Sequence, residues 1–288
     1  MLKCPMLKLG AHLSIAGGYE KAIESIKKIG GNCLQIFSSS PRTWADAKID
    51  DDQINIFLTE KKKNNIDPIY FHACYLLNLA DPEIVGKKSI HSLIYELNLA
   101  AKMNVKGSIV HTGSFKKMHG DESLAEFDHY NSLIKNIQHL LSESPAETYL
   151  ILENAGNRKI GKKIDHLAAI ISEINDSRIR ICLDTCHLHA SGYDLRSAAN
   201  FEVFLDEFDQ KIGLEKLEVV HMNDSRDAIG TLRDRHENIG EGYVGIEVFK
   251  NFLNHPKTKH LPFIIETPGF DDKGPDKKNL DILKSFIL

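Results

Sequence analysis

The stretch Tyr149-Leu150-Ile151-Leu152-Glu153 is an apolar run that ends on a carboxylate, and the same pattern recurs along the chain. Continuous apolar runs of this kind are typical of parallel strands that are buried on both faces. Five further runs end on a potential metal ligand, at His72, His111, Asp184, His221 and Glu266. Polar groups at the carboxyl ends of successive strands are how a closed parallel barrel builds one active site. The six strand ends therefore predict a barrel with a metal pocket at one rim.

Strand-like and helix-like stretches alternate from one end of the chain to the other. Eight candidate strands begin near Leu7, Asn32, Pro68, Gly107, Thr148, Ile179, Leu217 and Pro262. Between them apolar residues recur at helical spacing, as in 22–29, 133–140 and 201–208, and a last helix is expected from Lys277 onwards. Eight such units in 288 residues favour a closed (β/α)8 barrel, the TIM barrel of the α/β class. No linker or low-complexity tract divides the chain, so we expect one domain over residues 1–288.

Composition bears on the class of partner and on the compartment. The net charge of −4 gives no global basic signature for nucleic acid, although a local basic rim can coexist with an acidic body. Five scattered cysteines form no Cys-x-x-Cys pair and are expected to be reduced thiols of an intracellular protein. Residues 1–6 lack the apolar core of a signal peptide, and no run approaches the ~20 apolar residues of a membrane span. We therefore expect a soluble, cytoplasmic protein.

Three more candidate ligands lie outside the strand ends. His187 follows Asp184 by three residues, which can send both side chains into one pocket at a strand-to-loop transition. Asp234 and His236 are two residues apart, so they share one face of an extended segment. Both lie in the long irregular stretch 223–245, and a loop of this length in a compact domain is usually functional.

The total of nine candidate ligands, five His and four carboxylates, exceeds what one tetrahedral zinc ion takes. It indicates two or three ions that share a bridging carboxylate, and the His/carboxylate mixture favours Zn, Mn or Fe in a catalytic site. Cys182 and Cys186 flank Asp184 but have no second pair, so packing is the expected role of both. Clusters of two or three metal ions favour phosphoryl transfer or hydrolysis, with sugar isomerisation as the main alternative on a barrel.

Two segments after the second and third strands could face a nucleic acid. Residues 38–44 combine small polar side chains with Arg42 and the one Trp of the chain. Tyr75 and Leu76 follow His72, and an exposed Tyr-Leu pair can wedge into a base stack. The alternative is that Tyr75 and Leu76 begin a helix and pack beneath it. His12, at the end of the first strand, is a candidate to support a ligand without binding metal itself.

The motifs around these residues resemble the endonuclease IV family of apurinic/apyrimidinic endonucleases. The match is carried by His72 with residues 75–80 (YLLNLA), by residues 182–194 (CLDTCHLHASGYD), and by residues 221–225 (HMNDS) leading to 234–240 (DRHENIG). Residues 10–14 (GAHLS) are also similar, and the resemblance spans nearly the whole chain. One departure is residues 38–40 (SSS), where family members often carry Lys or Asn, and this change puts a phosphate contact in doubt.

The resemblance implies a TIM barrel with three zinc ions, with Mn²⁺ as an alternative at one site, and no nucleotide cofactor. The implied ligands are His72 and His111 on one ion, with Glu153 bridging to the second ion, then Asp184, His221 and Glu266 on the second, and His187, Asp234 and His236 on the third. Glu153 and Glu266 are the implied catalytic carboxylates. Arg42, Tyr75 and Leu76 are the implied DNA-binding residues, which enter the minor groove to expel the lesion.

The implied reaction is hydrolysis, by zinc-activated hydroxide, of the phosphodiester on the 5′ side of an abasic site in duplex DNA. It leaves a 3′-hydroxyl and a 5′-deoxyribose phosphate, and the implied role is base-excision repair, with removal of 3′-blocking groups as a further activity. A sugar without a base costs less to flip out of the duplex than a paired nucleotide, which gives a physical source of selectivity. The family also suggests a monomer without membrane contact that associates with the nucleoid when bound to DNA.

Two other classes of function stay open from the residues alone. A barrel sugar isomerase or epimerase would use Glu153, Asp184, His221 and Glu266, but it leaves His187 with Asp234 and His236 unexplained. A non-catalytic metal-binding or nucleic-acid-binding module has no reason to keep a bridging carboxylate. Metal content separates the endonuclease from the isomerase, because the endonuclease is expected to hold one more ion.

Overall fold

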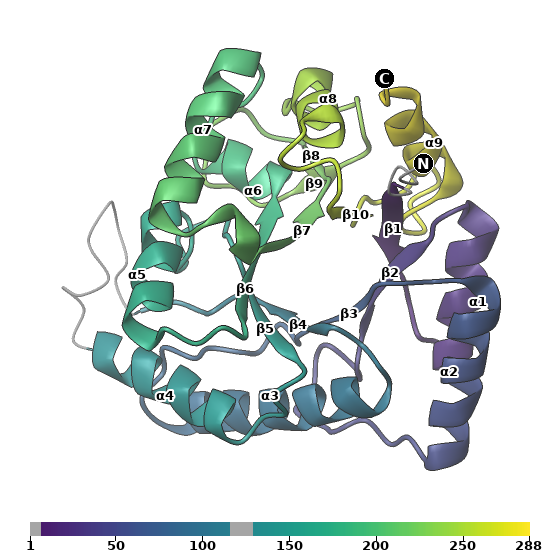
Figure 1. The fold of residues 1–288 in the computed structure, drawn as a ribbon, viewed down its shortest axis with the longest axis vertical. Coiled ribbons are helices and arrows are strands. Elements are labelled where there is room, and N and C mark those ends of the chain that lie inside the picture. The colour runs from purple at the N-terminus through teal and green to yellow at the C-terminus, as the bar shows by residue number, and fades with distance from the viewer. Residues whose placement is uncertain (1–6, 116–128) are drawn as a thin grey trace, which may run out of the picture.

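Eight parallel strands close into one barrel in the computed structural model, which describes residues 7–115 and 129–288 (Figure 1). The barrel strands are β1 (Lys8–His12), β2 (Cys33–Phe37), β3 (Ile69–His72), β4 (Gly107–Val110), β5 (Tyr149–Glu153), β6 (Ile179–Asp184), β7 (Leu217–His221) and β10 (Pro262–Ile265). Each strand pairs with its neighbours in chain order, and β1 closes the ring by pairing with both β2 and β10. The predicted (β/α)8 barrel is thereby confirmed. Residues 1–6, in which the absence of a signal peptide was predicted, lie outside the described residues.

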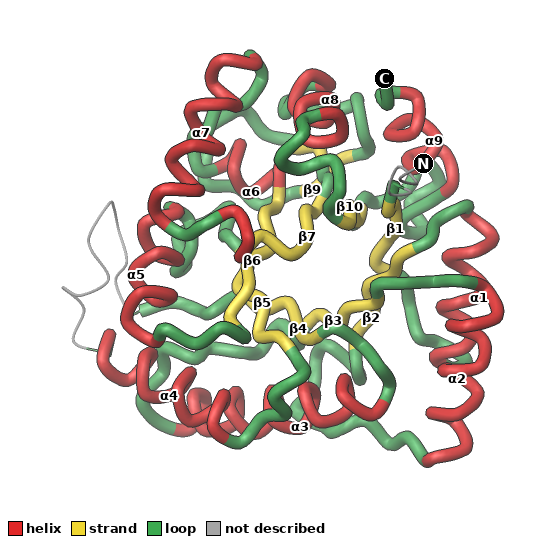
Figure 2. Tube along the Cα trace, viewed as in Figure 1, coloured by secondary structure: helices red, strands yellow, loops and turns green. Residues whose placement is uncertain are grey.

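Helices surround the ring of strands, as Figure 2 shows in red around yellow. They are α1 (Tyr19–Ile29), α2 (Asp51–Asn64), α3 (Ile84–Lys102), α4 (Tyr130–Ser142), α5 (Ile164–Ile174), α6 (Thr185–Ala190), α7 (Ala198–Lys211), α8 (Ile246–Asn254) and α9 (Lys277–Ser285), with a 3₁₀ turn at Leu214–Lys216. Each long helix turns an apolar stripe inward, such as Ala22, Ile23 and Ile26 of α1. Sequence periodicity did not single out α2, which buries only Ile54, Phe57 and Lys61.

The barrel interior is packed with buried side chains. Its middle layer consists of fully buried side chains from seven strands: Cys33, Tyr70, Ile109, Ile151, Cys182, Val219 and Ile264. The larger core lies between the strands and the helices. Because the interior is filled in this way, chemistry on this fold is confined to the rim, where the strands end.

The segment between β7 and α8 carries a small sheet of its own. Sequence reasoning expected residues 223–245 to be irregular, but β8 (Asp224–Ser225) and β9 (His236–Glu237) pair antiparallel within it. Strands of two residues are too short to leave an alternating pattern in the sequence, which is why the pairing was not expected. Within the described residues, no helix is both long enough and apolar enough to cross a bilayer.

Candidate metal centre

The six strand-end residues gather at the carboxyl rim of the barrel. His72, Glu153, Asp184 and His221 are the last residues of β3, β5, β6 and β7, and His111 and Glu266 come directly after β4 and β10. Since all eight strands run in the same direction, their last side chains meet at one end of the molecule. The fold therefore places these six residues together without any help from the loops.

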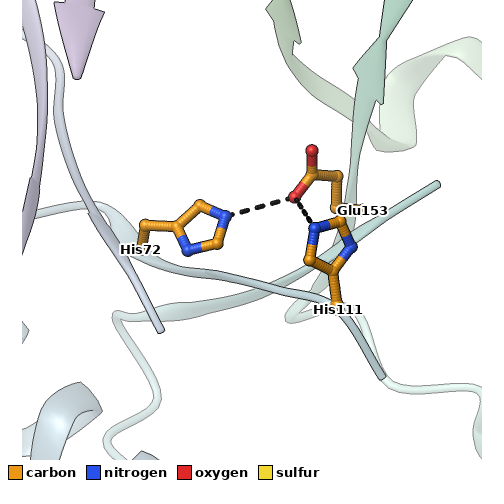
Figure 3. A group of neighbouring side chains, drawn as sticks. All are labelled: His72, His111 and Glu153. Atoms are coloured by element: carbon orange, nitrogen blue, oxygen red, sulfur yellow. Dashed lines mark hydrogen bonds and ion pairs between the residues drawn. The ribbon is translucent and has the colours of Figure 1, made fainter. Parts of the chain in front are cut away.

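The first group consists of His72, His111 and Glu153. Nε2 of His72 lies 3.2 Å from Oε2 of Glu153, and Nε2 of His111 lies 3.3 Å from the same oxygen. Figure 3 shows both imidazoles pointing at this carboxylate from two different strands. Nδ1 of His72 lies 2.9 Å from the carbonyl oxygen of Ala73, so this nitrogen donates its proton there and Nε2 keeps its lone pair.

The second group surrounds the other oxygen of Glu153. Nδ1 of His221 lies 3.1 Å from Oε1 of Glu153, 3.6 Å from Oε2 of Glu266 and 3.8 Å from Oδ2 of Asp184. These four side chains bring their ligand atoms within 4.8 Å of one another. Glu153 thus presents one oxygen to each of two neighbouring groups, which is the arrangement expected of a bridging ligand.

The third group combines α6 with the segment 223–245. Nε2 of His187 lies 3.0 Å from Oδ1 of Asp234, and Nε2 of His236 lies 3.5 Å from that oxygen. Asp184 caps α6 by accepting a hydrogen bond of 2.9 Å from the backbone N–H of His187. The expected strand-to-loop transition is therefore a strand-to-helix transition, and the cap orients His187 toward Asp234.

The electrostatic field at the carboxyl rim of the barrel favours the binding of cations. Burial alone would raise the pKa of Glu153, but His111 and His221 hold it well below its usual range. Burial alone would lower the pKa of His187, but Asp184 and Asp234 raise it well above the ordinary value. These opposed shifts show a set of ionised carboxylates whose charge must be balanced by protons or by metal ions.

Individual donor atoms also fit bound metal. Burial lowers the pKa of His111 to about 4, so this imidazole is neutral and able to act as a ligand at physiological pH. Nε2 of His236 is buried and makes no hydrogen bond to the described residues, although it faces Asp234 and Asp184. A buried polar atom without a partner is costly, and a cation between these groups would satisfy it. The mixture of imidazole and carboxylate ligands suits zinc.

A cavity of about 870 Å³ opens above the three groups. Tyr75 lies in its wall with 65% of its surface exposed, and its ring meets Phe37 edge-on at 5.4 Å. Leu76 is 38% exposed in the same turn. Helix α3 begins only at residue 84, so the structure does not bear out the alternative in which Tyr75 and Leu76 begin a helix.

Arg42 lies on the neighbouring segment after β2 and does not line the cavity. It is exposed, and no ion pair joins it to another described residue. The backbone N–H of Tyr75 donates a hydrogen bond of 3.1 Å to the carbonyl of Pro41, which ties the Arg42 segment to the Tyr75 turn. The two predicted DNA-facing segments are therefore adjacent at one side of the cavity.

Sequence reasoning missed three polar residues of the site. Gln35 is buried in the middle of β2, and its only sequence signal is that it interrupts an apolar run. Asn223 donates from its amide nitrogen to Oδ2 of Asp184 at 2.6 Å and accepts from the backbone N–H of Glu266 at 2.7 Å. Lys159 lines the cavity, from a loop whose sequence gives no indication of this position.

Cys182 and Cys186 are buried beside the ligand groups. Burial raises the pKa of each thiol to about 12, so both stay protonated at neutral pH. Their sulfur atoms lie within 4.8 Å of ligand atoms of the second group and of Asp184 with His236. Protonated, fully buried thiols agree with the packing role expected from the sequence.

Comparison with known proteins places the chain among TIM barrels and, more narrowly, among endonucleases. The family model described as the xylose isomerase-like TIM barrel matches residues 23–286. A protein named probable endonuclease 4, from Halothermothrix orenii, is 38% identical over 96% of this chain and 99% of its own length. The crystal structure of endonuclease IV from Thermus thermophilus superposes with a TM-score of 0.82 at 30% identity, covering 97% of this chain and 98% of that one. A D-tagatose 3-epimerase-like protein, with a TM-score of 0.70 and 20% identity over 96% of both chains, shares the fold.

Proposed function

Because the chain belongs to the endonuclease IV family, we propose that it is a zinc-dependent endonuclease that cleaves duplex DNA at abasic sites in base-excision repair. The proposed cut is on the 5′ side of the lesion and leaves a 3′-hydroxyl and a 5′-deoxyribose phosphate. Removal of 3′-blocking groups uses the same bond chemistry and is part of the proposal. The observation that carries it is the third ligand group, His187 with Asp234 and His236, beside the two groups that share Glu153.

In this proposal the three groups hold three zinc ions. Bound zinc supplies Lewis acidity toward the phosphodiester and lowers the pKa of water to near neutrality. Glu153 would help to hold both of the first two ions, because one oxygen faces His72 and His111 and the other faces His221. Glu266 would hold the second ion together with Asp184 and His221.

The cavity wall and the segments beside it supply the proposed contacts with DNA. Tyr75 and Leu76 would enter the minor groove and fill the space left by the missing base, since both are apolar and exposed beside the cavity. Arg42 would contact the backbone from the adjacent segment. An abasic sugar has no base to unstack, so its entry into the cavity costs less than entry of a normal nucleotide.

The test is incubation of the purified protein with an abasic duplex labelled at its 5′ end, with and without a strong chelator. We expect a single cut on the 5′ side, loss of cutting with chelator, and recovery on addition of zinc. Cutting that survives complete removal of metal, or no cutting by protein that holds zinc, would contradict the proposal.

A substitution in the third group sharpens this test. Asp234→Ala should remove one ion per chain and slow cleavage by roughly 100-fold or more, because a metal ion supplies several kcal/mol of transition-state stabilisation. Asp52→Ala, in the exposed first turn of α2, is the matched control and should keep both metal and activity. Full activity of Asp234→Ala on the abasic duplex would refute the assignment of the third group.

A further inference from the structure

The side chain of Gln35 points from the middle of β2 into the metal centre. It is fully buried, and its carboxamide contacts three site residues: His221, Glu266 and His12. Burying an amide in a barrel is costly unless its polar atoms are hydrogen-bonded. Here every contact of the amide is with a residue of the metal centre, so the amide serves that centre and not the core.

The orientation of the amide follows from Glu266. Nε2 of Gln35 lies 2.5 Å from Oε1 of Glu266, and Oε1 of Gln35 lies 2.7 Å from Nε2 of His221. The reverse orientation would place the amide oxygen against a carboxylate oxygen, and two acceptors repel at this distance. The amide nitrogen must therefore face Glu266, and the amide oxygen must face His221.

The tautomer of His221 follows in turn. A neutral imidazole carries one N–H and one lone pair, and an amide oxygen can only accept. Nε2 of His221 must therefore hold the proton, which leaves the lone pair on Nδ1. That atom is the one that faces Glu153, Asp184 and Glu266, at 3.1 to 3.8 Å.

We propose that Gln35 is a positioning residue of the second metal group: it sets the tautomer of His221 and the orientation of Glu266, and so determines the affinity of the ion held there. The proposal rests on the proposed metal-dependent function. His12, on the neighbouring strand, has its Nδ1 2.9 Å from the Gln35 nitrogen and 2.9 Å from Oε1 of Glu266, so this nitrogen either accepts from Gln35 or donates to Glu266. Partners of metal ligands commonly change metal affinity by about 10- to 100-fold when they are removed.

The first experiment measures metal retention in the full-length protein. Wild type, Gln35→Leu and Cys33→Ala are loaded with zinc, and the zinc that stays bound is measured against increasing chelator. Cys33 lies two residues earlier on β2, on the same side of the strand but in the packed middle layer, so it is the matched control. We expect Gln35→Leu to release one ion at roughly 10- to 100-fold less chelator, while Cys33→Ala follows wild type.

The outcomes separate this inference from the proposed function. Wild type that binds no zinc overturns both. Wild type that binds zinc, together with a folded Gln35→Leu that releases every ion at the wild-type chelator concentration, overturns the role of Gln35 alone.

A second measurement on wild type does not depend on any variant folding. In the zinc-loaded protein, ¹⁵N NMR of the histidine rings should show His221 with its proton on Nε2 and metal on Nδ1. The opposite tautomer overturns the proposal.

Discussion

At the scale of single residues, Tyr75 is the clearest candidate for contact with a nucleic acid. An aromatic side chain that is 65% exposed adds nothing to the core, and its ring touches Phe37 only by an edge. The turn that carries it is held to Pro41 and leads away from His72, so the ring stays next to the metal centre. Exposure at a fixed position is what a stacking platform for bases requires.

Tyr75→Ala should weaken binding to an abasic duplex much more than binding to single-stranded DNA. Loss of stacking costs roughly 1–3 kcal/mol, which is about tenfold or more in affinity. Fluorescence anisotropy with both DNA forms, on metal-loaded protein, measures the difference. Tyr243→Ala is the matched control, because Tyr243 is 63% exposed but lies outside the cavity wall. Equal weakening for both DNA forms would indicate that Tyr75 has no lesion-specific role.

Single residues also show where sequence reasoning reached its limit. His72, Glu153 and His221 could be predicted as members of one site because each ends an apolar run, and parallel strands bring such ends together. Gln35 could not, because it lies within a strand and its partners His221 and Glu266 are 186 and 231 residues away. Contacts at that separation depend on barrel closure, and local pattern carries no information about them.

At the scale of elements, the segment 223–245 is held in shape by one buried carboxylate. Asp224 accepts hydrogen bonds from the backbone N–H groups of Gly240 at 2.9 Å, Gly242 at 3.1 Å and Val244 at 2.9 Å. A side chain at Gly242 would meet Asp224 and the Ser225 carbonyl at about 2.5 Å or less, so glycine is required there. This anchor positions β9, which carries His236 of the third group.

Asp224→Ala should lower the free energy of unfolding and release the third ion more easily. The substitution removes the acceptor of four backbone N–H groups, among which those of Ser225 and Val244 are buried. The cost is on the order of 1–3 kcal/mol for each buried group that stays unsatisfied. Urea unfolding and zinc retention against chelator measure the two effects. Asp224→Asn, which keeps one acceptor oxygen, should fall between Asp224→Ala and wild type. An Asp224→Ala variant with wild-type zinc retention would show that the anchor does not support the third group.

Helix α3 contributes a second buried carboxylate. Glu96 is buried and accepts hydrogen bonds from the hydroxyls of Ser38 and Ser108. Burial raises the pKa of Glu96, despite both hydroxyl donors. The contact joins α3 to β4 and to the start of the Arg42 segment.

The raised pKa of Glu96 predicts that the difference in free energy of unfolding between wild type and Glu96→Gln depends on pH. Folded wild type holds the Glu96 proton more tightly than unfolded wild type does, so this stabilisation is complete below the unfolded pKa of about 4.5 and is lost as pH rises through the folded pKa. Glu96→Gln should therefore become more stable relative to wild type as pH rises from about 4 toward neutrality. Urea unfolding of both metal-free proteins across this range measures it, with the exposed Glu83→Gln as the charge control. If the difference in free energy of unfolding between the two proteins stays constant with pH, the pKa of Glu96 is not raised in the folded protein.

At the scale of the whole molecule, the candidate ligands lie at the ends of six strands or directly after them, on one helix and on the long segment after β7, so we expect metal binding to be coupled to folding. Without cations, the carboxylates of Glu153, Asp184 and Glu266 lie close together at the rim, and such like charges oppose folding. A ligand that binds only the folded state stabilises it by about 2.7 kcal/mol at a hundred times its dissociation constant.

Removal of metal should therefore lower Tm. Each kcal/mol is worth roughly 2 °C in a domain of this size, so release of one well-bound ion should cost roughly 5 °C. Differential scanning calorimetry with chelator, followed by addition of zinc, measures the loss and its recovery. Asp234→Ala, which is expected to lack one ion already, should show a smaller drop in Tm than wild type. An unchanged Tm in protein shown to have lost all its metal would contradict the coupling.

The fold as a whole was easier to predict than its parts. Alternating strand and helix patterns over nearly the whole chain admit few arrangements, so the barrel followed from them. Helix α2 was not predicted because Ile54 and Phe57 are its only buried apolar residues, and two residues make only a weak apolar stripe. The β8–β9 pair was not predicted because a strand of two residues is too short to show alternation of apolar and polar residues.

Closure of the barrel has a consequence for how the protein is made. His12 and Glu266 are 254 residues apart in the chain, yet their side chains lie 2.9 Å apart, because β10 completes the ring against β1. The ribosome synthesises Glu266 254 residues after His12. The second group of candidate ligands therefore stays incomplete on a nascent chain until Glu266 has been added and β10 has paired with β1.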